Sequence, residues 1–394
     1  MNSKRKKIYL DYAASTPVDP RVFDVMKPYF SEKFGNPGSV HSFGQDAIAA
    51  ADRSRETIAR AIGAEFREII FTGSATEANN LALRGIVKKY LDEFPRSDNN
   101  VKPRIIISTI EHESVLETAR ELEKEGIEVF YVPVNKEGVI DVDFLKKSLN
   151  ERTILVSVMY ANNEVGTIQP ITEIAEIISK YRMFTSLKYP FFHTDAVQAF
   201  QFLDCDVKKL GVDMMTLSAH KIYGPKGIGC LYSRVSLLSI VSGGGQEFGM
   251  RSGTENVPSI VGFAKAVELR SSLLVRSNEQ IHELCDYLWR GIKKIFPKAQ
   301  RNSPASKGKT LPNILNVSFP GLEAQDIITR LDLNGVAVSS GSACRSRALE
   351  ASHVIVAMGF SKERAKSSIR FSLGRLTNKK EIDSARAALK KILR

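Results

Sequence analysis

Apolar and polar positions follow two alternating periods from residue 43 onward. Short runs rich in β-branched residues indicate strands, and the segments between them have the apolar spacing of amphipathic helices. The predicted strands are 68–72, 104–109, 128–134, 153–160, 191–195, 214–218 and 229–232, and the predicted helices are 47–61, 77–90, 113–123, 142–149 and 171–180. This alternation predicts an α/β fold with a mainly parallel sheet. The last two strands lie close enough in sequence to form a hairpin-like edge of that sheet.

The pattern changes after a glycine-rich loop at residues 243–249. A long helical segment follows at 257–295, and we expect it to be kinked or broken near its middle and to connect two domains. The rest of the chain alternates again, with predicted strands at 314–319, 337–339 and 368–372 and predicted helices at 324–333, 353–358 and 380–393. These elements predict a second, compact α+β unit.

Composition excludes several classes of protein. Hydrophobic residues make up 43% of the 394 positions and charged residues 25%, which is typical of a soluble globular protein. The sequence has no apolar run long enough to span a membrane and no signal peptide, so we expect a cytoplasmic protein without a membrane partner. The net charge of +12 is spread among acidic residues rather than gathered in a stripe, so we expect no direct nucleic-acid partner.

The four cysteines, Cys205, Cys230, Cys285 and Cys344, are far apart in the sequence and form no metal-binding motif. We therefore expect no metal site. Cys344 lies in a loop of small residues beside Arg345 and Arg347, and neighbouring positive charge favours the reactive thiolate form. Cys344 is therefore a candidate nucleophile, whereas the other three have more apolar neighbours.

Two other residues point to pyridoxal 5'-phosphate chemistry. Lys221 follows one predicted strand and Asp195 ends another, and ligands of α/β proteins gather at such strand ends. A lysine that can form a Schiff base and an aspartate that can pair with a pyridinium nitrogen are what a protein contributes to this cofactor. Residues 73–77, where a helix follows a strand, could bind its phosphate. Taken singly, Lys221 could be a surface residue and Asp195 a helix cap.

Several segments together resemble the cysteine desulfurases of the class V aminotransferase family, in the branch that serves nitrogen fixation and housekeeping iron–sulfur assembly. They are 8–14 (IYLDYAA), 35–41 (GNPGSVH), 162–166 (NNEVG), 218–221 (SAHK), 249–254 (GMRSGT), 340–344 (SGSAC) and 369–375 (IRFSLGR). The resemblance implies a pyridoxal-phosphate-dependent transferase of fold type I, with a mainly parallel seven-stranded sheet in the large domain. That large domain would span 16–258, and a smaller α+β domain, formed by 1–15 and 259–394, would carry the catalytic cysteine loop.

The resemblance also implies roles for individual residues. Lys221 would hold pyridoxal phosphate and move the substrate proton, and Cys344 would attack the substrate sulfur. Asp195 would pair with the pyridinium nitrogen, Gln198 with the phenolic oxygen, and His112 would stack on the ring. The phosphate would be bound by Ala75, Thr76, Ser218 and His220, and by Thr254 of a second subunit. Asn162, which would also contact the cofactor, and Arg370 would bind the substrate carboxylate.

The activity so implied removes sulfur from L-cysteine and leaves L-alanine and a persulfide on Cys344. A homodimer is expected because Thr254 would complete the neighbouring site, and an iron–sulfur scaffold or a sulfur carrier, including one for tRNA thiolation, would accept the sulfur. The alternatives are a selenocysteine lyase, which the sequence does not separate from a desulfurase, and a class V aminotransferase, which has no use for the thiol of Cys344. A noncatalytic basic scaffold fits less well because the positive charge is dispersed.

Overall fold

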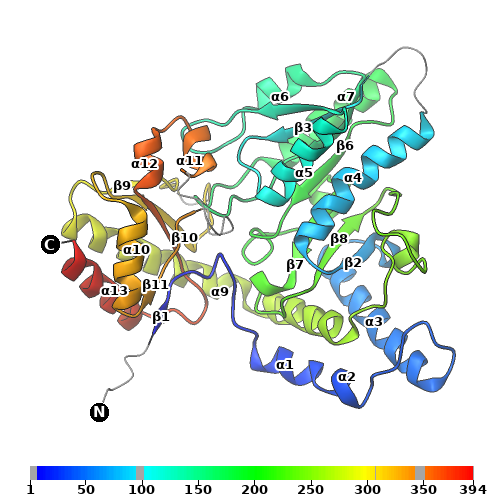
Figure 1. Ribbon diagram of the computed structural model, residues 1–394, viewed down its shortest axis with the longest axis horizontal. Helices are drawn as coiled ribbons and strands as arrows, with labels where there is room; N and C mark the ends of the chain where they lie inside the picture. Colours follow the sequence, from blue (N-terminus) through cyan, green and yellow to red (C-terminus); the bar gives the residue numbers. More distant parts are fainter. Residues whose placement is uncertain (1–6, 95–101, 307, 342–350, 394) are drawn as a thin grey trace.

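The structure is a computed structural model that describes residues 7–94, 102–306, 308–341 and 351–393 (Figure 1). A seven-stranded sheet forms its larger part, in the order β2-β8-β7-β6-β5-β3-β4. The strands in that order are Ile69–Thr72, Gly229–Ser233, Met214–Ser218, Phe191–Asp195, Thr153–Ser157, Arg104–Ser108 and Glu128–Val132. From β7 to β4 all neighbours are parallel, and β8 runs antiparallel to both β7 and β2. The predicted α/β fold with a mainly parallel sheet is confirmed.

The pairing of β7 with β8 is the predicted hairpin-like contact, but its predicted place at the sheet edge is wrong. The strand β2 adds to the free side of β8, so β2 forms that edge. Sequence proximity indicates which strands pair, but it does not show that a strand from much earlier in the chain occupies the next position.

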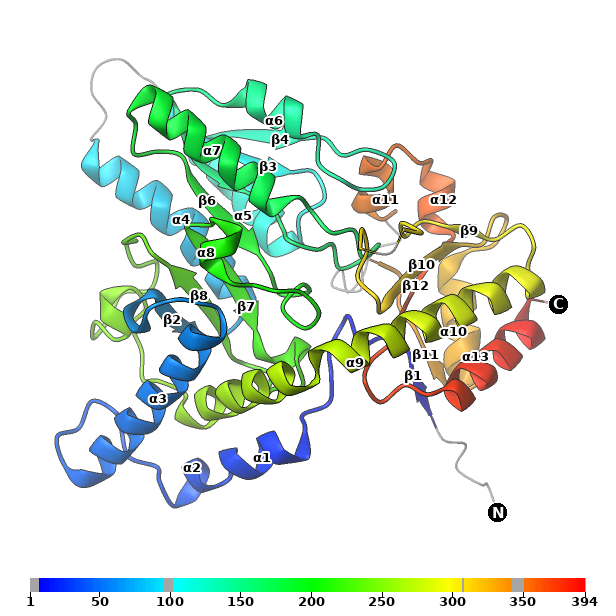
Figure 2. The same ribbon diagram turned by 180° about the vertical axis from the view of Figure 1, so that it is seen from behind.

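Helices cover both faces of the sheet, and strand residues alternate between two apolar cores. Ile105 and Ile107 of β3 pack with the buried faces of α4 (Ala75–Glu93) and α5 (Glu113–Lys124). Ile106, between them, belongs to the core on the opposite face, which is covered by helices that include α3 (Ser42–Ala61), α7 (Ile171–Thr185) and α8 (Val207–Leu210). The two views show these helices on opposite sides of the sheet (Figure 2). Burial on both faces explains the nearly continuous apolar runs of the central strands.

The helix α9 (Val257–Ile295) runs unbroken through 39 residues, so the predicted kink is wrong. Its one proline, Pro258, lies in the first turn, and its middle contains neither proline nor glycine, the residues that commonly kink a helix. The helix packs against α1 (Pro20–Met26) and α3 with one part and against α13 (Lys379–Ile392) with another. It therefore links the large sheet to the C-terminal part of the chain (Figure 2).

The C-terminal part contains an antiparallel sheet in the order β12-β10-β9. Its strands are Ser368–Ser372, Ile314–Ser318 and Gln300–Arg301, and the helices around it are α10 (Ala324–Leu333), α11 (His353–Ala357), α12 (Lys362–Lys366) and α13. The N-terminal strand β1 (Ile8–Tyr9) pairs in parallel with β11 (Val336–Ala337), which joins the first residues to this part. The remaining described α-helices are α2 (Pro28–Ser31) and α6 (Val142–Ser148), and the short 3-10 helices are η1 (Phe66–Glu68), η2 (Ala219–Lys221) and η3 (Glu247–Gly249). None of the helices within the described ranges is both long and apolar enough to cross a membrane.

Candidate active site

A cavity of about 460 Å³ lies at the carboxyl edge of the large sheet. The strands β6 and β7 end in its wall at Asp195 and Ser218, and Lys221 follows in the short helix η2 (Ala219–Lys221). Gly341 and Arg370 complete the wall from the C-terminal part. The cavity therefore lies where α/β folds bind their ligands and also contacts the second unit.

Lys221 points its amino group at the N-terminal segment of the chain. Its Nζ donates hydrogen bonds to the backbone carbonyls of Ala13 (2.6 Å) and Ala14 (2.8 Å). The amide of Gln198 donates to the same Ala13 carbonyl at 2.9 Å. These acceptors are neutral backbone groups, so neither contact ties Lys221 to a carboxylate, and all four residues line the cavity.

Asp195 is 6% exposed and held in a fixed orientation. Its Oδ2 accepts a hydrogen bond from Asn79 Nδ2 (2.8 Å), and its Oδ1 accepts one from the backbone N–H of Val197 (3.0 Å). Asn79 Nδ2 also donates to Ser114 Oγ at 2.8 Å, next to His112. Asn79 thus links the carboxylate to the start of α5. This residue was not predicted from the sequence, because a buried asparagine inside a helix carries no motif.

His112 lies where the start of α5 meets the cavity. It is the N-cap of α5, where its Nδ1 accepts the backbone N–H of Ser114 at 3.1 Å, and it also lines the cavity. The cap fixes the imidazole at the end of the helix. A ring fixed in this way can pack against a planar ligand in the cavity.

The N-terminus of α4 forms the second polar wall of the cavity. Ser74 caps the helix by accepting the N–H of Glu77 (3.1 Å), and Ala75 and Thr76 of the first turn line the cavity. The first N–H groups of a helix lack intrahelical partners and attract anions. Gly229 faces this turn from β8, where a Cβ would lie only 2.8 Å from the Ala75 nitrogen. Glycine at this position lets the first turn of α4 pack closely against β8.

The cavity wall beside Lys221 also contains His220 and Lys226. Burial lowers the pKa of His220 to about 4, and the positive charges of Lys221 and Lys226 act in the same direction. The imidazole is therefore neutral at physiological pH. Its Nδ1 lies 3.2 Å from Ser15 Oγ. Together with the amides of α4, this wall favours an anionic group.

Arg370 reaches the cavity from β12 with its guanidinium already positioned. Its Nη1 donates to the Asn163 carbonyl (2.8 Å) and its Nη2 pairs with Asp11 (2.8 Å), while the buried Nε has no hydrogen-bond partner among the described residues. Arg375, at the end of the same segment 369–375, lies outside the cavity wall, and its guanidinium packs over the Tyr223 ring.

Asn162, which was predicted to bind the cofactor and the substrate carboxylate, is not among the residues that line the cavity. It is fully buried, and its Oδ1 accepts the N–H groups of Glu164 (2.8 Å) and Val165 (2.9 Å), while Nδ2 donates to the Ile110 carbonyl (3.1 Å). The neighbouring Asn163 lines the cavity instead. Two adjacent asparagines cannot be told apart from the sequence, and only the geometry of the turn shows which one lines the cavity.

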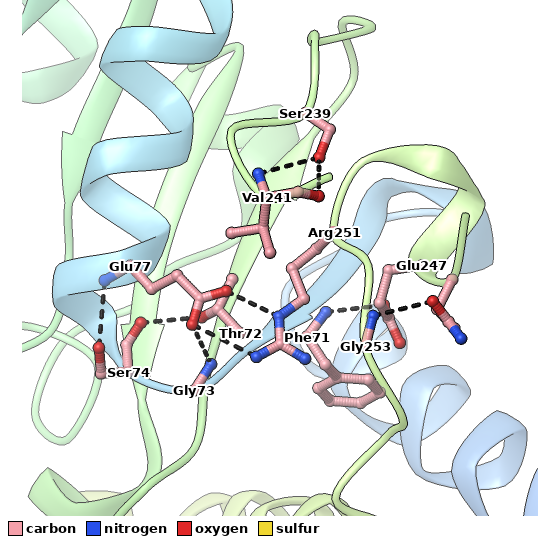
Figure 3. Close-up of polar contacts among 11 residues, drawn as sticks. Phe71, Thr72, Gly73, Ser74, Glu77, Ser239, Val241, Glu247, Arg251 and Gly253 are labelled. Carbon is pink, nitrogen blue, oxygen red and sulfur yellow. Dashed lines mark hydrogen bonds and ion pairs between the residues drawn. The ribbon is translucent and has the colours of Figure 1, made fainter. Parts of the chain in front are cut away.

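Thr254 is exposed and does not line the cavity of its own chain. The loop before it is held against the α4 N-terminus, where Arg251 Nε pairs with Glu77 (2.7 Å) and Glu77 also accepts the N–H of Gly73 (2.8 Å) (Figure 3). In the same loop Glu247 binds Arg55 through two hydrogen bonds of 2.7 and 2.8 Å. These contacts fix the base of the loop while Thr254 faces outward.

Cys344 lies outside the described residues. The other three cysteines are buried free thiols, and burial raises the pKa of Cys205 and Cys285 to about 12 and that of Cys230 further still. None of these three is a thiolate at neutral pH. The remaining predicted residues, Ala75, Thr76, His112, Asp195, Gln198, Ser218, His220, Lys221 and Arg370, all line the one cavity.

Known proteins share both the sequence and the fold. The class V aminotransferase family model matches residues 8–384. A cysteine desulfurase IscS of Dictyoglomus turgidum is 44% identical over 391 residues, which cover 99% of this chain and 95% of the relative. A solved NifS-like protein has a TM-score of 0.89 at 37% identity and covers 98% of this chain and 99% of its own. SspA in complex with cysteine has a TM-score of 0.78 at 36% identity and covers 93% of this chain and 98% of its own.

The fold and the cavity define an enzyme of the class V aminotransferase family with fold type I, and this chain belongs to that family. Within the family it belongs to the cysteine desulfurases, because relatives of that name are 43–44% identical over nearly its full length.

Proposed function

We propose that this protein is a pyridoxal 5'-phosphate-dependent enzyme that transfers the sulfur of L-cysteine to Cys344. The observation that carries the proposal is one cavity that combines Lys221, the fixed carboxylate of Asp195, the open N-terminus of α4 and the guanidinium of Arg370. A lysine, an acid for the ring nitrogen and an anion site are what this cofactor requires of a protein. The similar SspA was solved in complex with cysteine, which supports L-cysteine as the substrate.

The residues present fit the cofactor. Ala75, Thr76, Ser218 and His220 would hold its phosphate, since they line the cavity where the N-terminus of α4 meets it. Asp195 would face the ring nitrogen, Gln198 the phenolic oxygen and His112 the ring. Lys221 would hold the aldehyde carbon. When bound, the cofactor supplies an electron sink that stabilises negative charge at the substrate carbon.

Arg370 would bind the substrate carboxylate. Its planar guanidinium is already held by the Asn163 carbonyl and by Asp11, so it does not need to be ordered when the substrate arrives. A guanidinium fork matches the two oxygens of a carboxylate in geometry and charge. We transfer the amide role that was predicted for Asn162 to Asn163, because Asn163 lines the cavity.

The transfer of sulfur from the substrate to Cys344 needs no external oxidant. The thiolate of Cys344 attacks the substrate sulfur, the carbon–sulfur bond breaks as a sulfur–sulfur bond forms, and the electron pair stays on the substrate carbon. Protonation of that carbon yields L-alanine. Lys221 would move protons on the substrate, since its amino group belongs to the cavity wall.

Three finer points belong to the same proposal. The chain would act as a homodimer in which Thr254 completes the phosphate site of the neighbouring subunit. The large domain would span 16–258, and the smaller domain 1–15 and 259–394. The persulfide would pass to an iron–sulfur scaffold or a sulfur-carrier protein in the cytoplasm.

The test measures alanine formed from L-cysteine by purified wild-type protein, with Lys221→Ala as the variant. The wild type should show the visible absorbance of the cofactor and form alanine and, with a thiol reductant, sulfide in equal amounts. Lys221→Ala should form neither. Absence of alanine from the cofactor-loaded wild type would refute the proposal. L-Selenocysteine, tested alongside, should not be preferred; a strong preference for it would favour the selenocysteine lyase alternative.

A further inference from the structure

We propose that the buried carboxylate of Glu164 is a positioning group that holds together the two ends of the chain segment carrying Cys344. The inference rests on the proposed function, because it assigns Glu164 the task of placing the nucleophile at the cavity. Glu164 is 2% exposed and follows Asn163 of the cavity wall. No chemical role for it was predicted from the sequence.

The turn that contains Glu164 is fixed from both parts of the molecule. Asn162 accepts the Glu164 N–H at 2.8 Å and is itself bound to the carbonyl of Ile110. Asn316 of β10 donates to the Glu164 carbonyl at 3.1 Å. The carboxylate therefore projects from a rigid support rather than from a free loop.

The end of the segment that follows Cys344 is bound to this carboxylate. Ser352 Oγ donates to Glu164 Oε2 at 2.5 Å, and Ser352 is 6% exposed. A hydrogen bond from a hydroxyl to a carboxylate is among the short, strong kinds. Ser352 is also the N-cap of α11, where it accepts the N–H of Ile355 at 3.3 Å. The next residue, His353, has Nε2 3.1 Å from the carbonyl of Glu111, which makes a second attachment.

The end that precedes Cys344 packs against the same carboxylate. Gly341 lines the cavity, and a Cβ added to it would collide with the carboxyl group of Glu164. Only glycine allows the backbone to approach so closely. One side chain therefore contacts both attachment points of the segment, and it does so beside Asn163, at the wall that the substrate would face.

The bond between Ser352 and Glu164 is separate from the role of Ser352 as the N-cap of α11. Ser361 caps α12 in the same part of the molecule, accepting the N–H of Arg364 at 3.2 Å, and α12 has the same length as α11. Its hydroxyl has no contact with Glu164 among the hydrogen bonds of the described residues. Ser361→Ala is therefore a matched control for Ser352→Ala, because each variant loses one serine N-cap but only the latter loses the bond to Glu164.

Two measurements on the cofactor-loaded protein test the proposal. The first is the rate of tryptic cleavage after Arg345 and Arg347, which needs no catalysis. We expect cleavage of Ser352→Ala to be roughly tenfold faster than that of the wild type, because a hydrogen bond to a charged acceptor stabilises the attachment of Ser352 by about that factor. Ser361→Ala should be cleaved at the wild-type rate, and Ser352→Thr, which keeps the hydroxyl, should restore that rate.

The second measurement is alanine formed in a single turnover at saturating L-cysteine. Ser352→Ala should be slower by on the order of tenfold while its affinity for L-cysteine is unchanged, because a small displacement of a reacting group reduces the rate and not substrate binding. Wild-type values for Ser352→Ala in both measurements, or equal losses in Ser361→Ala, would overturn the proposal. If the wild type forms no alanine, the proposed function fails, and the cleavage rates still decide the positioning role.

Discussion

Glu111, adjacent to His112, is a buried acid whose replacement gives a prediction that depends on pH. Its side chain is fully buried, and Oε1 accepts the hydroxyl of Ser108 (2.5 Å) and the N–H of Met159 (2.8 Å). Burial, which outweighs these two hydrogen bonds, raises the pKa of Glu111 from 4.5 to about 8, and the negative charge of Asp195 acts in the same direction. Glu111 is thus neutral at pH 7 and adds no second negative charge beside Asp195.

The sign of the effect follows from proton binding. Between about pH 4.5 and pH 8 the folded protein keeps the Glu111 proton that the unfolded chain has lost, so the free energy of unfolding falls as the pH rises through this window. The free energy of unfolding changes by ~1.4 kcal/mol per pH unit, so it falls by on the order of 5 kcal/mol across this window. Glu111→Gln keeps a side-chain oxygen that can accept the bonds from Ser108 and Met159, but it cannot ionise. The fall in the free energy of unfolding with rising pH should therefore be absent from the variant.

Thermal melting of the wild type, Glu111→Gln and Glu117→Gln between about pH 5 and pH 8 measures the effect. Glu117 is the matched control, since it is an exposed acid on the same helix, α5. The melting temperature of Glu111→Gln relative to the wild type should rise by several degrees across this range, while that of Glu117→Gln should stay level. A Glu111→Gln difference that is constant with pH would refute the claim that Glu111 is buried as a neutral acid.

Two further predictions concern the cavity. Gly229→Val places a side chain against the Ala75 N–H group, so the purified variant should carry little cofactor, measured as visible absorbance per chain; full loading would contradict the anion site at α4. Arg370→Lys keeps the charge but loses the guanidinium fork, so KM for L-cysteine should rise by roughly 10- to 100-fold with normal cofactor loading. An unchanged KM would remove Arg370 from the substrate site.

Much of the fold could be predicted from apolar periodicity. Each predicted strand of the large sheet is present, because central parallel strands are buried on both faces and contain few polar residues. Strand order could not be predicted, and β2 beside β8 is the example, since that contact joins segments far apart in the chain. The continuity of α9 was also missed, although its sequence contains no residue that would break its middle.

Part of the cavity wall could be predicted from the chemistry of single residues and from their positions beside strands. Lys221 and Asp195 end or follow strands and were found from chemistry and spacing, and the resemblance added His112, Gln198 and Arg370. Residues that act by holding others were missed, among them Asn79, Gly229 and Glu164, because their roles depend on neighbours distant in sequence. For the same reason the sequence did not show that Asn163, rather than Asn162, lines the cavity.

The central claim is that sulfur leaves L-cysteine by attachment to Cys344, and mass analysis of the protein's peptides after addition of L-cysteine tests it most directly. The three buried thiols, Cys205, Cys230 and Cys285, provide an internal comparison in the same sample. We predict one additional sulfur atom on the peptide that contains Cys344, present only after L-cysteine is added, and loss of alanine formation in Cys344→Ala. Alanine formation by Cys344→Ala at the wild-type rate, or additional sulfur on another cysteine, would contradict the account.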